Sequence, residues 1–283
     1  MSHGYVPSEI ANEIEFPPSL ARLWHLRGYY GSLKHNVRGI YAYYLGWYDG
    51  NPATLDSLPP RDLARRTLEY MGGVEAVLTR ARADYAMGDY RWVVHILDQV
   101  IWAEPENMAA RELAAAAHTQ MGYGSENPTW RNAYLSAANE LRAGLPKGDK
   151  NHRVLRDVLK GMSPLLLMNS LSIRLNGPKA AGRAFTINWC IAGTDESCHS
   201  ELSNAVLNNR EGLDPHAVLS ITLPRELLSD FALGHITPEG IQGPDVMFEG
   251  DKTVLSSLAD LLDIFPAWFP IATHDLKSGE TNL

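Results

Sequence analysis

Residues 85–107 read YAMGDYRWVVHILDQVIWAEPEN, and this stretch decides the fold of the first half of the chain. A turn at Gly88 separates two apolar patterns of helical spacing, and Pro105 ends the second one. A Gly-Asp-Tyr turn followed seventeen residues later by proline is typical of tetratricopeptide-like helical hairpins. The stretch therefore predicts helices packed as hairpins.

The same helical spacing continues outward on both sides of this stretch. Helices are predicted over Glu75–Met87, Arg91–Ala103, Met108–Gly122 and Pro128–Leu141. Only about one and a half hairpin units are visible, so an apolar flank is left uncovered, and we expect it to pack on another domain or subunit. We assign residues 1–145 to one helical domain.

Residues 143–150 (AGLPKGDK) are small, polar and helix-breaking, and they predict a domain boundary. The spacing then changes, and residues 146–283 are predicted as an α+β domain in which helices cover an antiparallel sheet. The expected strands are Phe185–Ile191, Ser197–Asn208, Ala217–Leu223 and Val246–Asp251, and the expected helices are His152–Met162, Pro164–Asn176, Pro224–Gly234 and Lys252–Leu262.

The composition limits the class of protein. With 283 residues and 45% hydrophobic content, the chain can form two domains, each with its own core. A formal charge of -8 argues against a nucleic-acid or anionic-membrane partner. Cys190 and Cys198 are too few for a disulfide framework or a structural zinc site. Without a long apolar run, we expect a soluble protein with no integral membrane segment, in the cytoplasm or the periplasm.

Three strings near the start of the chain carry a resemblance. They are WHLRGYYGS at 24–32, HNVRGIY at 35–41 and YLGWYDGNP at 44–52, and EYMGG at 69–73 and GYGSEN at 122–127 follow. In this order they resemble the signature of alkyl sulfatases of the metallo-β-lactamase type. The resemblance implies a helical dimerisation domain in residues 1–145 and a sterol-carrier-like C-terminal domain, with an apolar tunnel, in residues 146–283.

The family's hydrolase domain precedes both parts and binds two zinc ions through a T-H-x-H-x-D-H motif. The ten histidines of this chain form neither that motif nor H-E-x-x-H, so we assign no metal site and expect no cofactor in this chain. Zinc lowers the pKa of bound water, and without it a sulfate ester lacks a strong nucleophile at neutral pH. We therefore expect the chain alone to be inactive as a sulfatase.

His35 is the one candidate catalytic residue. The resemblance suggests that it projects toward a partner hydrolase site, where an imidazole can orient substrate or protonate a leaving oxygen. In the structural alternative, His35 and Asn36 only cap the helix that begins here.

Arg27, Tyr30, Asn36 and Tyr44 are the candidate substrate-binding residues. Together with Lys34 and Arg38, Arg27 can form an anion-attracting rim for a sulfate group, because guanidinium groups bind oxyanions through paired hydrogen bonds. Surface ion pairs with Glu13 or Glu15 are the alternative. The aromatic residues of this region are either a buried helix face or a contact surface. They are Tyr29, Tyr30, Tyr41, Tyr44, Trp47 and Tyr48.

The second domain contains more apolar helix surface than a small sheet needs. A tunnel for an alkyl chain and an ordinary core both fit this pattern. The candidate lipid-binding residues are Leu228, Phe231, Met247, Phe265 and Trp268. The last two belong to the segment FPAWFPI at 265–271, whose prolines exclude a long helix, so its rings are expected to dock on a surface or cover an opening.

These observations leave three functional hypotheses. In the first, the chain is the dimerisation and substrate-recruitment part of an alkyl sulfatase, with residues 150–283 holding long-chain alkyl sulfates or fatty amphiphiles. In the second, it is a free-standing lipid-binding protein. In the third, it completes the active site of a separate chain of the metallo-β-lactamase type through His35.

Overall fold

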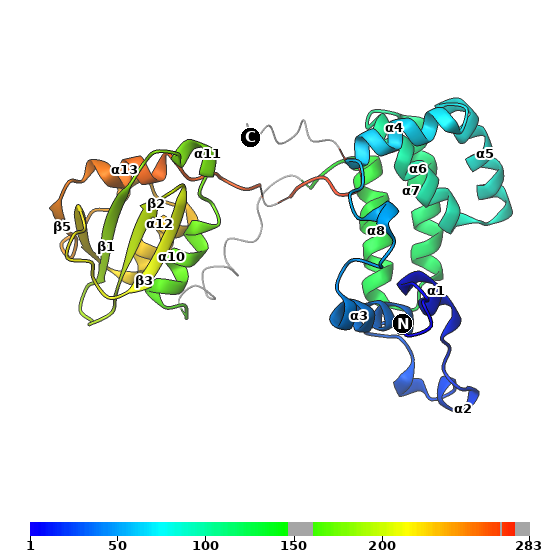
Figure 1. Ribbon diagram of the computed structural model, residues 1–283, viewed down its shortest axis with the longest axis horizontal. Coiled ribbons are helices and arrows are strands. Elements are labelled where there is room, and N and C mark those ends of the chain that lie inside the picture. The colour runs from blue at the N-terminus through cyan, green and yellow to red at the C-terminus, as the bar shows by residue number, and fades with distance from the viewer. Residues whose placement is uncertain (147–160, 267, 275–283) are drawn as a thin grey trace. The chain divides into compact units, whose positions relative to one another are not determined.

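The computed structural model describes residues 1–146, 161–266 and 268–274, and these form two compact units (Figure 1). Residues 1–146 and 268–274 belong to the first, helical unit, and residues 161–266 belong to the second. Most of the helix expected over His152–Met162 lies outside the described residues. No helix in the described ranges is long and apolar enough to cross a membrane.

The helical unit follows the predicted helices closely. Its α-helices are α1 (Pro7–Glu13), α2 (Pro18–Ala21), α3 (Leu33–Leu45), α4 (Pro60–Tyr70), α5 (Val74–Met87), α6 (Tyr90–Ala103), α7 (Met108–Gly124) and α8 (Pro128–Ala143). Gly88 ends α5 in the left-handed conformation, at a φ of 85°, which glycine adopts at little cost. Asn107 and Asn127 cap α7 and α8 through their side-chain oxygens.

The core of the helical unit lies among α4 to α8. Helix α6 supplies the centre of this core, where Val93, Leu97 and Val100 are fully buried. The buried residues of α7 in the core are alanines, whose small side chains allow α6 and α7 to pack closely. Helix α3 is different, because only Val37 and Tyr41 of its thirteen residues are buried. It packs against α1, which leaves most of its surface uncovered by the described residues.

The second unit is a sheet covered by helices. Its strands are β1 (Phe185–Ile191), β2 (Ser197–Ser203), β3 (Val206–Glu211), β4 (Leu219–Leu223) and β5 (Met247–Gly250), and its α-helices are α10 (Pro164–Ser172), α11 (Gly177–Ala180), α12 (Arg225–Leu233) and α13 (Thr253–Ala259). The strand order is β3-β2-β1-β4-β5. This confirms an α+β unit after a helical one.

Two features of this sheet differ from the expectation. The sheet is mixed rather than antiparallel, because β4 pairs in parallel with β1, with Ile187 opposite Leu219. The chain passes from the edge strand β3 back to the start of β1 through residues 212–218 and then runs in the same direction as β1. The single strand expected over Ser197–Asn208 is wrong, since Asn204 and Ala205 take positive φ values and turn the chain into a hairpin of β2 and β3.

Candidate functional site

The predicted site residues gather at the start of α3. Ser32 is the N-cap of this helix, and its Oγ accepts a hydrogen bond from the backbone N–H of His35 at 3.1 Å. The capping function is therefore filled by Ser32, and the His35 side chain is exposed on the first turn. The His35 imidazole therefore does not cap α3, contrary to the structural alternative considered from the sequence.

A pocket of about 650 Å³ lies beside this turn, and we call it the N-terminal pocket. Three of the four predicted substrate-binding residues, Arg27, Tyr30 and Asn36, line it. The other lining residues come from the segment 16–33 and from the loop that leads into α8, up to Trp130. Tyr44, the fourth predicted residue, is not among the lining residues; it lies near the end of α3, exposed and edge-on to Tyr43.

Two of the three cations of the predicted anion-attracting rim, Arg27 and Lys34, have partners other than Glu13 and Glu15. Arg27 forms an ion pair with Glu126, with 2.5 Å between Nη2 and Oε1. Both side chains are roughly half exposed, so the pair contributes at most about 1 kcal/mol. Lys34 donates to the side-chain oxygen of Asn12 at 3.0 Å. Arg27 and Glu126 thus line the pocket together and form a weak ion pair there.

Asn127 is a pocket residue that sequence reasoning missed. Its Oδ1 accepts the backbone N–H of Trp130 at 2.9 Å and caps α8, while its side-chain amide nitrogen is buried without a hydrogen-bond partner. The residue is 95% buried, and a buried polar group without a partner costs free energy. The Asn-Pro pair signals a helix start in sequence, but nothing local indicates an unpaired donor beside a pocket.

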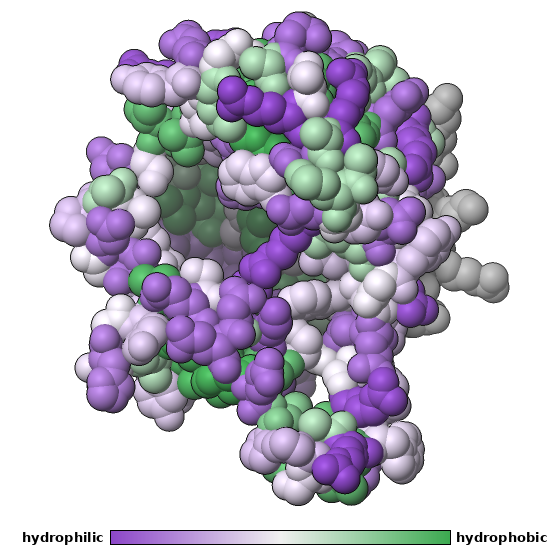
Figure 2. Space-filling model, turned by 90° about the vertical axis from the view of Figure 1, so that its right-hand side faces the viewer, coloured by the Kyte–Doolittle hydropathy of each residue, from purple (hydrophilic) through white to green (hydrophobic). Residues whose placement is uncertain are grey.

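The surface around this region is aromatic. Of the six aromatic residues considered from sequence, Tyr41 is buried, Tyr48 is half-buried, and Tyr29, Tyr30, Tyr44 and Trp47 are exposed. We define the exposed aromatic surface by seven side chains: Trp24, Tyr30, Ile40, Tyr43, Tyr44, Leu45 and Trp47. Figure 2 shows one side of the molecule, where hydrophobic residues reach the surface among hydrophilic ones. Exposed apolar surface of this extent on one short segment is typical of an interface.

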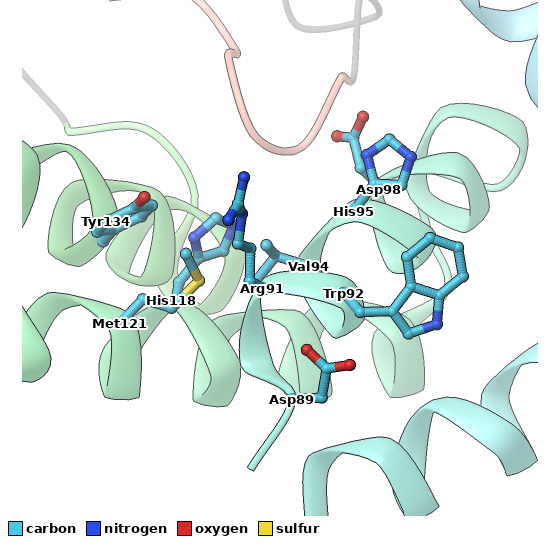
Figure 3. A pocket seen from close by; sticks show the side chains of 9 residues that line it. All are labelled: Asp89, Arg91, Trp92, Val94, His95, Asp98, His118, Met121 and Tyr134. Atoms are coloured by element: carbon cyan, nitrogen blue, oxygen red, sulfur yellow. The ribbon is translucent and has the colours of Figure 1, made fainter. Parts of the chain in front are cut away.

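A second pocket, of about 630 Å³, lies on α6, α7 and α8 and was not anticipated (Figure 3). His95 and Asp98 of α6 lie on one side of it, and Met121 and Tyr134 lie on the other. Burial lowers the pKa of His118, and the nearby Asp98 carboxylate opposes that shift. The Nδ1 atom of His118 is buried without a hydrogen-bond partner.

The predicted lipid-binding residues do not form one group. Leu228 and Phe231 of α12 are in the core of the second unit, where Phe231 lies 5.8 Å from the ring of Trp189. Met247 on β5 and Phe265 are exposed on that unit. Trp268 belongs to the helical unit, where it lines a groove along α8.

Metal ligation has no support among the described residues. In these ranges, no group of three or more His, Cys, Asp and Glu side chains could hold a metal ion. The two cysteines lie on neighbouring strands, where Cys198 pairs with Trp189 and Cys190 pairs with Ser197. Burial raises the pKa of Cys198 to about 12, with a smaller contribution from Cys190, so its thiol stays protonated at neutral pH.

Fold and pockets together describe a helical interaction domain joined to an α+β domain. Residues 6–144 match the family model described as alkyl sulfatase dimerisation, and residues 153–274 match the one described as alkyl sulfatase C-terminal. These two matches cover most of the chain, which therefore belongs to the alkyl sulfatase family through its dimerisation and C-terminal domains. A dimerisation domain implies self-association.

Individual relatives agree with this assignment. The alkyl/aryl-sulfatase BDS1 of Saccharomyces cerevisiae is 39% identical over 272 residues, which are 96% of this chain and 42% of that protein. A linear primary-alkylsulfatase of a Pseudomonas species is 41% identical over 95% of this chain and 40% of its own length. The structure of the stereoselective inverting sec-alkylsulfatase Pisa1 from Pseudomonas superposes with a TM-score of 0.87 at 38% identity, over 96% of this chain and 43% of that one. The chain thus spans about two fifths of the length of these relatives.

Proposed function

We propose that this chain is the dimerisation and substrate-recruitment part of an alkyl sulfatase. In this proposal the helical unit self-associates, and the N-terminal pocket contributes Arg27, Tyr30 and Asn36 to a substrate site completed by a zinc-bearing hydrolase domain. The observation that carries the proposal is the exposed aromatic surface, which lies on the same segment as three of the pocket residues. Such a surface is costly in water unless a protein partner covers it.

Ile40 on α3 gives an estimate of the free energy that one covered side chain contributes to dimer formation. This side chain is 53% exposed. Complete burial of an isoleucine contributes about 1.5–3 kcal/mol, so covering the exposed half contributes about 1–1.5 kcal/mol. In a twofold dimer each contact occurs twice, which gives about 2–3 kcal/mol, or a factor of about 30 to 150 in the dimer dissociation constant.

Sedimentation velocity on the full chain tests the self-association. The wild-type chain is expected to form dimers at micromolar concentration, and Ile40→Glu is expected to weaken them by at least about thirtyfold. Ile173→Glu is the matched control, because Ile173 is also exposed, at 74%, but belongs to the second unit. A wild-type monomer at tens of micromolar, or equal weakening by both variants, would contradict the proposal.

His35 is proposed to act on substrate only when the hydrolase domain is present. The imidazole is exposed on the first turn of α3, beside the N-terminal pocket, and is free to contact a bound group. The test adds a separate zinc-loaded hydrolase domain from a relative and measures turnover of dodecyl sulfate. His35→Ala is expected to lower turnover at least about tenfold, and His216→Ala, an exposed histidine of the second unit, is the control. Equal turnover by wild type and His35→Ala would reject this role.

Alkyl-chain binding by the second unit stays a separate part of the proposal. Its support is limited to the exposed apolar side chains Met247 and Phe265, since Leu228 and Phe231 already fill the core. Displacement of a fluorescent fatty acid by alkyl sulfates of different length tests it. Saturable displacement that Met247→Ser weakens supports binding here, whereas no saturation at any chain length rejects it.

A further inference from the structure

The last described residues of the chain, 268–274, lie on the helical unit and bend at 271–273, and we call this segment the strap. One carboxylate oxygen of Glu140 on α8, Oε1, accepts three consecutive backbone N–H groups of the strap, from Ile271, Ala272 and Thr273, at 2.9–3.0 Å. The hydroxyl of Thr273 donates to the same oxygen at 2.9 Å. Hydrogen bonds to an ionised acceptor are stronger than hydrogen bonds between neutral groups, and here four donors share one carboxylate oxygen.

His274 forms the second half of the contact. Its Nε2 lies 2.7 Å from Oδ1 of Asp98 on α6. Its ring stacks on Trp102 of the same helix, with centroids 3.7 Å apart and an interplanar angle of 10°. Both Thr273 and His274 are more than nine-tenths buried, and Ala272 packs against the helical core. The strap is therefore held by side-chain and backbone interactions together.

The strap follows the second unit in the sequence but belongs to the helical unit. The family match for the C-terminal domain extends to residue 274, yet the contacts of residues 268–274 are with the helical unit. The chain enters the second unit from the helical unit after Pro146 and belongs to the helical unit again from Trp268. The second unit is thus connected to the helical unit at both of its ends.

We propose that the strap is a docking motif which the α6 and α8 face of the helical unit recognises through Glu140 and Asp98, and that its docking tethers the second unit at both ends. The partner of this face is the chain's own Ile-Ala-Thr-His segment. A segment fixed at both ends has less conformational freedom than one fixed at a single end. Docking of the strap therefore restricts the motion of the second unit, and release of the strap restores it.

Asp98 links the strap to the second pocket. Its Oδ1 lies within hydrogen-bond distance of Nε2 of His274, and its side chain also lines the pocket that contains His95 and His118 (Figure 3). The strap passes beside this pocket in the same view. Docking engages one oxygen of Asp98, so the strap sets part of the polarity of that pocket.

Hydrogen–deuterium exchange on the full chain tests the docking. Exchange of the amides of Ile271, Ala272 and Thr273 is expected to be slow in the wild type, because Glu140 accepts all three. Glu140→Ala is expected to speed it at least about tenfold, and Glu140→Gln, which keeps an uncharged acceptor, is expected to have a smaller effect. Asp98→Ala is expected to speed exchange at the end of the strap.

Controls separate undocking from unfolding. Glu112→Ala removes an exposed glutamate from α7 and is expected to leave strap exchange unchanged. Exchange of the α6 and α8 amides reports whether the helical unit stays folded in each variant. Small-angle X-ray scattering is expected to show a broader range of dimensions for Glu140→Ala than for Glu112→Ala. Fast strap exchange in the wild type, or equal exchange in wild type and Glu140→Ala with α6 and α8 protected, would overturn the proposal.

Discussion

Ser200→Ala is expected to destabilise the second unit by removing the centre of a buried hydrogen-bond chain. The Nε1–H of Trp189 donates to Oγ of Ser200 at 2.9 Å, and that hydroxyl donates to Oδ1 of Asn209 at 2.6 Å. Trp189 and Ser200 have no exposed surface. Alanine at 200 therefore leaves an indole N–H that neither the protein nor water can satisfy.

The expected loss of stability is the sum of the costs of losing the hydrogen bonds of Ser200 with Trp189 and with Asn209. An unsatisfied buried donor costs about 1–3 kcal/mol. Asn209 is only half-buried and can turn to water, so loss of the second bond costs about 0.5–1.5 kcal/mol. The total is about 1.5–4.5 kcal/mol in the free energy of unfolding of the second unit.

Native-state hydrogen exchange at the central amides of β1 measures this free energy for the second unit alone. Trp189→Phe removes the indole donor, so Ser200→Ala in that background is expected to cost about 1–3 kcal/mol less than in the wild type. Ser203→Ala, half-buried on the same strand, is the control and is expected to cost less than about 1 kcal/mol. Equal costs of Ser200→Ala in the two backgrounds would refute the reasoning, because the indole would then not depend on the hydroxyl.

Three further predictions concern single residues. Gly250→Ala is expected to destabilise the second unit by more than about 3 kcal/mol in thermal unfolding, because its φ is 103° and a Cβ would lie 2.3 Å from the carbonyl oxygen of Val218; a melting temperature within a degree of the wild type would contradict this. Iodoacetamide at pH 8 is expected to spare Cys198, whose pKa is about 12, in the native protein and to label it after unfolding, as mass spectrometry of the peptides can show. Burial places the pKa of His118 in the folded state below its unfolded value near 6.5, so its stabilising contribution is present above that pH and is lost as the pH falls through the folded value. The wild type is therefore expected to lose more stability than His118→Gln between pH 7.5 and pH 5.5, and equal losses in the two proteins would show that this residue does not contribute.

Local signals predicted the helices well. Gly88 and Pro105 mark ends of helices that the structure confirms, because a left-handed residue and a missing backbone donor act within a few residues. The hairpin of β2 and β3 was missed because its turn residues, Asn204 and Ala205, lack the glycine of common hairpin turns. The parallel pairing of β1 and β4 depends on the path of the chain between strands, which has no local signature.

The candidate site was predictable only in part. Arg27, Tyr30 and Asn36 were named from a short segment, and the structure places them on one pocket. Asn127, which completes the lining, lies about ninety residues later in the chain, so spacing could not connect it to them. The strap contacts join residues 131 to 176 positions apart, and they consist of hydrogen bonds to carboxylates and of ring stacking, which no periodic pattern encodes.

The return of the chain to its first unit has a consequence for synthesis on the ribosome. The helices of that unit emerge first, but Asp98 and Glu140 receive their partners only when residues 271–274 follow, after the whole second unit. Domains generally fold as units in the order in which they are made, and here the earliest unit is completed by some of the latest residues. A ribosome stalled or a gene ended before residue 268 would therefore yield helices on which Asp98, Glu140 and Trp102 lack the contacts that residues 271–274 provide.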